Sequence, residues 1–152
     1  IKVASNLERI GDYGKNMAKR SLVMEPSLIT EQGSNSLRRM TKDVISMMNN
    51  ALDAYVRKDV ELAEAVIIQD KDIDLHYNAL FREFLTFMME DPKNITTCMH
   101  LHFIAKNIER VGDYVTSIAE QAIYVATGEY PSEERPKADT TSLTKVDSES
   151  AS

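Results

Sequence analysis

Apolar residues recur at steps of three and four along most of the chain, which is the spacing of one face of an α-helix. The first such stripe consists of Val3, Leu7, Ile10, Met17 and Met24. Longer stripes follow over about 34–57, 60–90 and 92–127. No segment shows the two-residue alternation of a half-buried strand. The pattern therefore predicts an all-α fold, an antiparallel bundle of long helices with short connections.

Residues with special backbone chemistry mark the expected ends of these helices. Pro26 should end the first helix, because the residue before a proline is pushed out of the helical region. Gly33-Ser34-Asn35-Ser36 is predicted to form a flexible connection that caps the second helix. Asp59 is the expected N-cap of the third helix, and Pro92 suits the first turn of the fourth, which should end near Gly128.

An eight-residue phrase occurs twice in the chain. Its copies are Asn6-Leu7-Glu8-Arg9-Ile10-Gly11-Asp12-Tyr13 and Asn107-Ile108-Glu109-Arg110-Val111-Gly112-Asp113-Tyr114, which differ only in aliphatic exchanges. The match extends to the pair Ala4 and Ala105 and the pair Ala18 and Ala119. An interval of about a hundred residues is too long for a solenoid unit, so it indicates two copies of a small domain.

The two copies fall at unequal places in the predicted bundle. The last three helices make a complete three-helix unit that ends in the phrase. The first helix carries the same phrase, so it should be the last helix of an earlier unit. Because the pattern is already under way at Ile1, we expect that unit to lack its two leading helices. Its stripe of Val3, Leu7 and Ile10 should then be exposed, unless the rest of the chain or another chain covers it.

Each copy of the phrase places two carboxylates one helical turn apart. At about 100° per residue, Glu109 and Asp113 share one side of their helix and point away from its apolar stripe. Glu8 and Asp12 have the same relation to Leu7. We therefore expect these acids on an outer or flanking face. The small Gly112 and Ala105 lie between stripe and acids, where a neighbouring helix could approach closely.

The third helix has its own pair, Asp70 and Asp74, beside its apolar stripe. If it packs antiparallel to the fourth helix, this pair and the pair of Glu109 and Asp113 fall at similar heights. Four carboxylates would then converge with no lysine or arginine at their centre, and such a cluster either takes up protons or binds a cation. Oxygen ligands favour Mg²⁺, Mn²⁺, Ca²⁺ or iron, with Zn²⁺ as a further option.

The alternative is that the acids form an ordinary solvated surface. Arg9 and Arg110 adjoin the acid pairs and could neutralise them. Against this, both copies keep a glycine in mid-helix, where it costs about 0.5–1 kcal/mol relative to alanine. A solvated surface gives no reason to retain it, which favours a built site.

Composition narrows the class of function. The 152 residues carry a formal charge of −6 without a basic stretch, which argues against nucleic-acid binding. Cys98 is the only cysteine, so no internal disulfide forms, and no apolar run approaches the length of a membrane span. From Glu129 to Ser152 the chain is polar and too poor in apolar residues to offset its ordering entropy, which predicts a disordered tail.

The histidines and nucleophiles give little support to catalysis. No histidine belongs to the Glu-x-x-His pair of ferritin-like di-iron sites, so a carboxylate-bridged metalloenzyme ranks last. His102 lies two turns before Glu109 and could be an accessory ligand, whereas His76 falls in an apolar stripe and should be packed. No phosphate loop, nucleophile elbow or Ser-His-Asp set is present.

The paired phrase, with Asn16-Met17-Ala18 after its first copy, resembles the PhoU family of phosphate-transport regulators. The resemblance covers about Ile1 to Gly128 and implies two three-helix repeats, each with a Glu/Asp-x-x-x-Asp motif. It divides the chain into the last helix of a truncated first repeat (1–25), a complete second repeat (34–128) and the tail (129–152). Some members carry iron or zinc clusters. Carried over by position, the metal ligands would be Glu8, Asp12, Asp70, Asp74, Glu109 and Asp113.

The resemblance also implies a function. It suggests a cytoplasmic, non-enzymatic and often homodimeric regulator that inserts into no membrane. Such a protein acts with the ATP-binding subunit of a phosphate transporter and with a membrane sensor histidine kinase, and it damps starvation signalling when phosphate is plentiful. The alternative is a structural helical adaptor without metal, whose acidic pairs are solvated or bind basic partner segments.

Overall fold

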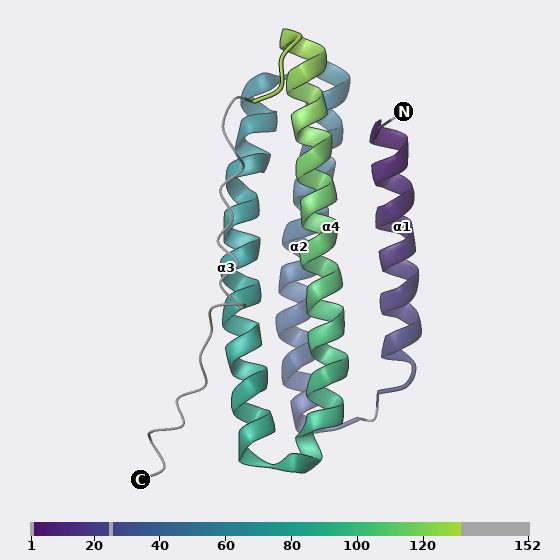
Figure 1. Cartoon of the computed structure of the whole chain (residues 1–152), viewed down its shortest axis with the longest axis vertical. Helices are drawn as coiled ribbons and strands as arrows, with labels where there is room; N and C mark the ends of the chain where they lie inside the picture. The colour runs from purple at the N-terminus through teal and green to yellow at the C-terminus, as the bar shows by residue number, and fades with distance from the viewer. Residues whose placement is uncertain (1, 25, 132–152) are drawn as a thin grey trace.

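The computed structural model describes residues 2–24 and 26–131, and it is a bundle of long helices (Figure 1). These are α1 (Lys2–Ser21), α2 (Leu28–Arg57), α3 (Val60–Glu90) and α4 (Ile95–Thr127), with a short 3-10 turn η1 (Pro92–Asn94) before α4. The described part contains no strand, so the predicted all-α bundle is confirmed. None of its helices has the length and apolarity that a membrane crossing requires. Residues 132–152 of the predicted tail lie outside the described residues.

Several helix ends follow the predicted chemistry. The Asp59 side chain accepts a hydrogen bond from the Leu62 N–H at 3.1 Å, so it caps α3 as expected. Gly128, at a φ of 79°, ends α4 and donates its N–H to the Tyr124 carbonyl at 2.7 Å. This left-handed conformation suits glycine, which has no Cβ to clash. α1 ends at Ser21, earlier than the stop expected before Pro26.

The predicted connection at residues 33–36 is wrong, because α2 starts at Leu28 and runs through it. Ser27 is the true N-cap, and its hydroxyl accepts from the Thr30 N–H at 3.0 Å. Gly33 is buried against α4, and a Cβ added to it would lie 2.6 Å from Leu101 Cδ1. The glycine therefore permits close helix packing here, whereas the sequence suggested flexibility.

α4 is the central helix of the bundle (Figure 1). It packs against α1, α2 and α3, while α1 packs mainly on α4. The core lies between α2, α3 and α4, and its largest buried side chains include Met40, Met47, Ile73, Tyr77, Leu80, Phe84, Leu101 and Ile118. Because helices pack against several sides of α4, residues outside its apolar stripe are buried as well. This packing determines which acidic side chains of α3 and α4 are buried.

α1 has no fully buried residue, yet it is not bare. Val3, Ile10, Tyr13 and Met17 are half-buried against the core, and Leu7 remains 39% exposed. The expected exposure of the first stripe therefore holds only in part, because α4 covers much of it.

α1 and α4 run antiparallel, and the two copies of the phrase meet (Figure 1). The rings of Tyr13 and Tyr114, which hold the same place in the phrase, lie 5.8 Å apart. In an antiparallel pair related by a two-fold axis, equivalent residues meet only at the axis. Arg20 lies over Phe103 at one end, and their counterparts Gln121 and Lys2 share the Tyr130 hydroxyl at the other. An approximate local two-fold axis therefore relates α1 to α4.

Candidate metal centre

Three aspartates from two helices converge inside the bundle. Asp70 and Asp74 lie one turn apart on α3, and Asp113 comes from α4. One oxygen of each lies within 4.8 Å of the others. Asp70 and Asp74 are 0% exposed and Asp113 is half-buried. The structure thus brings together three of the six predicted ligands.

The absence of a side chain at Gly112 lets these carboxylates approach α4. A Cβ at this position would lie 3.0 Å from Asp70 Oδ1 and 3.7 Å from Ile73 Cγ2. Ala105 and Ala119, each about two turns away on the same side, are buried as well. A neighbouring helix therefore does approach closely at Gly112, and that helix is α3.

Glu109 takes a different role from the aspartates. It is 2% exposed, and one of its carboxylate oxygens lies 3.2 Å from Lys106 Nζ. The Lys106 ammonium also lies 5.0 Å from the centre of the Tyr77 ring. Glu109 is outside the group of three, so its part as a ligand stays a prediction. A lysine thus lies beside one of the four predicted carboxylates, as the i, i+3 spacing of Lys106 and Glu109 in the sequence allows.

The outer or flanking face expected for the acids of the second phrase is covered at this site, since Glu109 is 2% exposed and Asp113 is half-buried. Asp70, Asp74 and Glu109 are among the buried residues. The angles around a single helix place its side chains relative to its own apolar stripe, but they do not determine which neighbouring helix covers them. α3 packs on the acid-bearing side of α4, and that packing turns a flank of the helix into interior.

The first copy of the phrase forms no such group. Glu8 and Asp12 are both exposed on α1. The described residues contain no set of three close acids, histidines or cysteines that includes either of them. Their predicted role as metal ligands is therefore untested.

The histidines do not join the aspartates. The His102 ring lies 5.2 Å from the ring of Phe81 and 5.9 Å from that of Tyr77, which places it in an aromatic layer. His76 is half-buried. His102 as an accessory ligand thus gains no support from the group of three acids.

The chemistry of the donors fits a hard cation. Buried like charges this close either share a proton or bind a positive ion. Two ligands of one ion at about 2.0–2.6 Å can be no more than about 4–5 Å apart, and the aspartate oxygens meet that limit. The three close acidic residues could therefore hold a metal ion between α3 and α4. Oxygen-only donors suit Mg²⁺, Mn²⁺ or iron better than Zn²⁺.

Comparison with known proteins agrees with this architecture. The PhoU domain model matches residues 37–122, which include the three aspartates and the second phrase. The chain belongs to the PhoU family. It is 47% identical over 142 residues to a phosphate-specific transport system accessory protein PhoU homolog of Rhizobium meliloti (strain 1021), covering 93% of this chain and 60% of the relative.

Further relatives carry the same description. The PhoU homolog of Caulobacter vibrioides (strain NA1000 / CB15N) is 44% identical over 139 residues, 91% of this chain and 60% of the relative. That of Xylella fastidiosa (strain 9a5c) is 42% identical over 147 residues, 97% of this chain and 62% of the relative. The chain thus spans about 60% of the length of these relatives.

Proposed function

We propose that this chain is an accessory regulator of phosphate uptake that carries a metal ion between α3 and α4. Family membership and the relatives' description as phosphate-specific transport system accessory proteins support the role. The buried group of Asp70, Asp74 and Asp113 supports the metal. Its partners would be the ATP-binding subunit of a phosphate transporter and a membrane sensor kinase. It would act in the cytoplasm, as a homodimer and without catalysis.

The metal would act as an electrostatic link between the two helices. Asp70 and Asp74 would hold it from α3 and Asp113 from α4. A bound divalent cation offsets the repulsion of these carboxylates and adds its binding free energy to the folded state. Glu109, whose Oε2 lies 3.2 Å from Lys106 Nζ, would be a further ligand from α4. The order of preference is Mn²⁺, Mg²⁺ or iron before zinc, because every donor is oxygen.

We further propose that α1 is the last helix of the first three-helix repeat (1–25), which precedes the complete second repeat (34–128). Its phrase has the acids and the small residues of the α4 copy, but a Cβ at Gly11 would meet nothing within 4 Å. The local two-fold axis at Tyr13 and Tyr114 would place a helix like α3 against this open side. That helix, from upstream sequence or another chain, would bring two acids to Glu8 and Asp12.

The structural adaptor without metal remains the second candidate, and one observation favours it. Glu8 and Asp12 are exposed, so this pair is available to solvent or to a basic partner segment. The same account fails for Asp70 and Asp74, which no solvent reaches.

Metal content and thermal unfolding of matched variants test the metal. Added Mn²⁺ should stabilise the parent protein by about 2.7 kcal/mol when its concentration is a hundred times the dissociation constant. Asp113→Asn should lose both the bound metal and this stabilisation. Asp43→Asn is the control, with the same change at an exposed aspartate of α2 that belongs to none of the predicted ligand sets, and it should behave like the parent. Equal metal content in parent and Asp113→Asn protein would refute the site.

Reporter expression tests the regulatory role. In a bacterium that lacks its own PhoU protein, expression of this chain should repress a phosphate-starvation reporter when phosphate is plentiful. The chain should also bind the transporter's ATP-binding subunit, as isothermal titration calorimetry can measure. Full reporter activity together with no measurable binding would contradict the role.

A further inference from the structure

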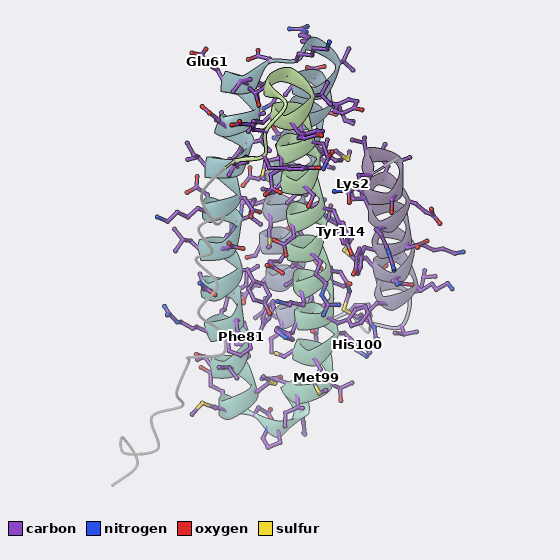
Figure 2. All side chains as sticks on the ribbon, turned by 45° about the horizontal axis from the view of Figure 1, so that its top comes forward. Lys2, Glu61, Phe81, Met99, His100 and Tyr114 are labelled. Atoms are coloured by element: carbon purple, nitrogen blue, oxygen red, sulfur yellow. The ribbon has the colours of Figure 1, made fainter. Side chains whose placement is uncertain are left out.

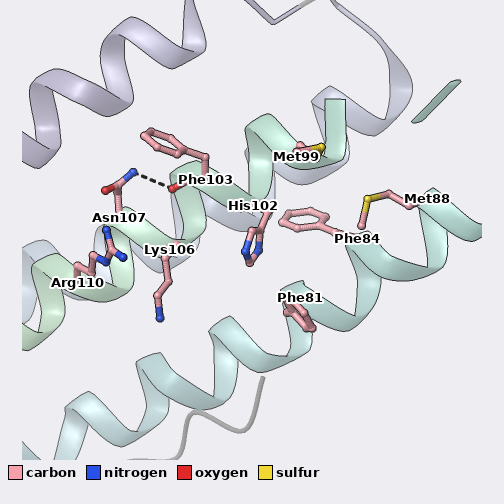
Figure 3. Close-up of a pocket in the computed structure, with 9 residues that line it drawn as sticks. All are labelled: Phe81, Phe84, Met88, Met99, His102, Phe103, Lys106, Asn107 and Arg110. Carbon is pink, nitrogen blue, oxygen red and sulfur yellow. Dashed lines mark hydrogen bonds between the residues drawn. The ribbon is translucent and has the colours of Figure 1, made fainter. Parts of the chain in front are cut away.

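A cavity of about 430 Å³ lies between α3 and α4 (Figure 3), toward the end of the bundle where Figure 2 labels Phe81 and Met99. Its volume falls within the range of about 300–1,000 Å³ that is usual for binding pockets. The residues that line it are Phe81, Phe84, Met88, Met99, His102, Phe103, Lys106, Asn107 and Arg110. The metal centre uses none of them directly.

The interior of the cavity is apolar and aromatic. Phe81 from α3 meets the His102 ring edge-on, with the ring centres 5.2 Å apart (Figure 3). Phe84 is buried beside them, and Met99 is exposed at the α4 side. Such a surface accepts an aromatic or aliphatic side chain and excludes water from it.

Cationic groups stand along one side of the cavity. Arg110 is exposed, and it forms no ion pair within the described part of the chain. From α1, the Arg20 guanidinium lies 4.1 Å from the centre of the ring of Phe103, a lining residue, and it also lies within 3.3 Å of the Nδ1 of His100. Lys106 is the remaining cation, with its charge shared with Glu109. This side is therefore locally basic on a chain whose formal charge is −6.

We infer that this cavity docks an acidic segment of a partner protein, with one aromatic side chain inserted among Phe81, Phe84 and Met99. Carboxylates beside that anchor would meet Arg110 and Arg20. Arginine pairs well with carboxylates and remains charged at all physiological pH values. Arg110 lines the cavity whereas Arg20 does not, so a ligand that meets both arginines has to extend from the cavity over Phe103 toward α1, as a peptide can.

This inference names the chemistry of one partner contact and depends on neither the metal nor phosphate signalling. Its test uses only the purified chain and a peptide, so its failure leaves the proposed function standing. Conversely, failure of metal binding or of reporter repression leaves the docking site standing.

The probe is a short, fluorescently labelled peptide with one phenylalanine between two pairs of glutamates. Its binding to the purified chain is measured by fluorescence anisotropy. Arg110→Glu should weaken its binding about tenfold or more, equivalent to about 1.4 kcal/mol. Met99→Glu, at an exposed lining residue, should weaken it similarly because it puts a negative charge at the entrance. Arg82→Glu is the matched control, an exposed arginine of α3 that does not line the cavity.

Peptide variants separate the two parts of the site. Serine in place of the phenylalanine tests the anchor, and glutamine in place of the glutamates tests the charge; each should bind at least about tenfold more weakly. Absence of binding by the parent peptide, or equal loss in Arg82→Glu and Arg110→Glu, would overturn the inference. Phenylpropionate that binds as tightly as the peptide would also overturn it and assign the cavity to a small anion.

Discussion

The two copies of the phrase have almost the same residues and entirely different surroundings. In α4 the phrase lies at the centre of the bundle, with Gly112 against Asp70 and Glu109 paired with Lys106. In α1 the equivalent Gly11 has open space beside it, and Glu8 is exposed. A motif therefore carries the capacity for a site, while the neighbouring helix determines whether the site forms.

The largest difference between the two copies is expected in the free energy of unfolding, when the aliphatic residue that follows the first asparagine of the phrase is truncated. Ile108 is 2% exposed and Leu7 is 39% exposed. Ile108→Ala should lower the free energy of unfolding by about 2–5 kcal/mol, because it leaves a cavity in the core. Leu7→Ala should lower it by less than about 1 kcal/mol. Urea denaturation of both variants measures the difference, and equal losses would mean that α1 is as deeply buried as α4.

Substitution of the two glycines of the phrase should give a smaller difference in the free energy of unfolding. Gly112→Val forces a side chain into the space next to Asp70 and Ile73, and overpacking of this kind costs about 1–3 kcal/mol. Gly11→Val meets nothing nearby and should change stability by less than about 0.5 kcal/mol. Thermal unfolding compares them. Should Gly11→Val be as destabilising as Gly112→Val, the open side of α1 would be covered in solution.

The smallest expected effect is on the pKa of Tyr114, which faces Tyr13 at the local two-fold axis. A hydrogen bond with the Tyr13 hydroxyl and some burial raise the pKa of Tyr114, and Arg9 and Arg110 oppose this. Tyr13→Phe should therefore lower the pKa of Tyr114. A raised folded-state pKa stabilises the fold below the unfolded value of about 10, and the contribution is lost as pH rises through the folded value.

Carbon-13 NMR of labelled tyrosine, titrated in alkaline solution, follows this ionisation. Tyr55→Phe, at a tyrosine of α2 outside the pair, is the control and should leave the Tyr114 titration unchanged. An unchanged Tyr114 titration in Tyr13→Phe would mean that the two phrases do not meet in solution.

Much of the fold followed from local chemistry. The helical periods, the Asp59 cap and the Gly128 end depend on residues near one another in sequence, so the sequence predicted them. Residues 33–36 were predicted as a loop because glycine, serine and asparagine usually mark one. The competing cause was Leu101 of α4, a residue distant in sequence whose side chain occupies the space that a Cβ at residue 33 would need.

The sequence by itself determined which residues can act together: the carboxylates of the repeated phrase, the Asp70 and Asp74 pair, and the small residues beside them. Only the tertiary structure decided which carboxylates meet. Packing of α3 on α4 gathers Asp70, Asp74 and Asp113 and buries Glu109 with Lys106, while Glu8 and Asp12 remain exposed. The physical reason is that a helix fixes the angles of its own side chains, whereas the burial of a charge depends on which helix lies against it.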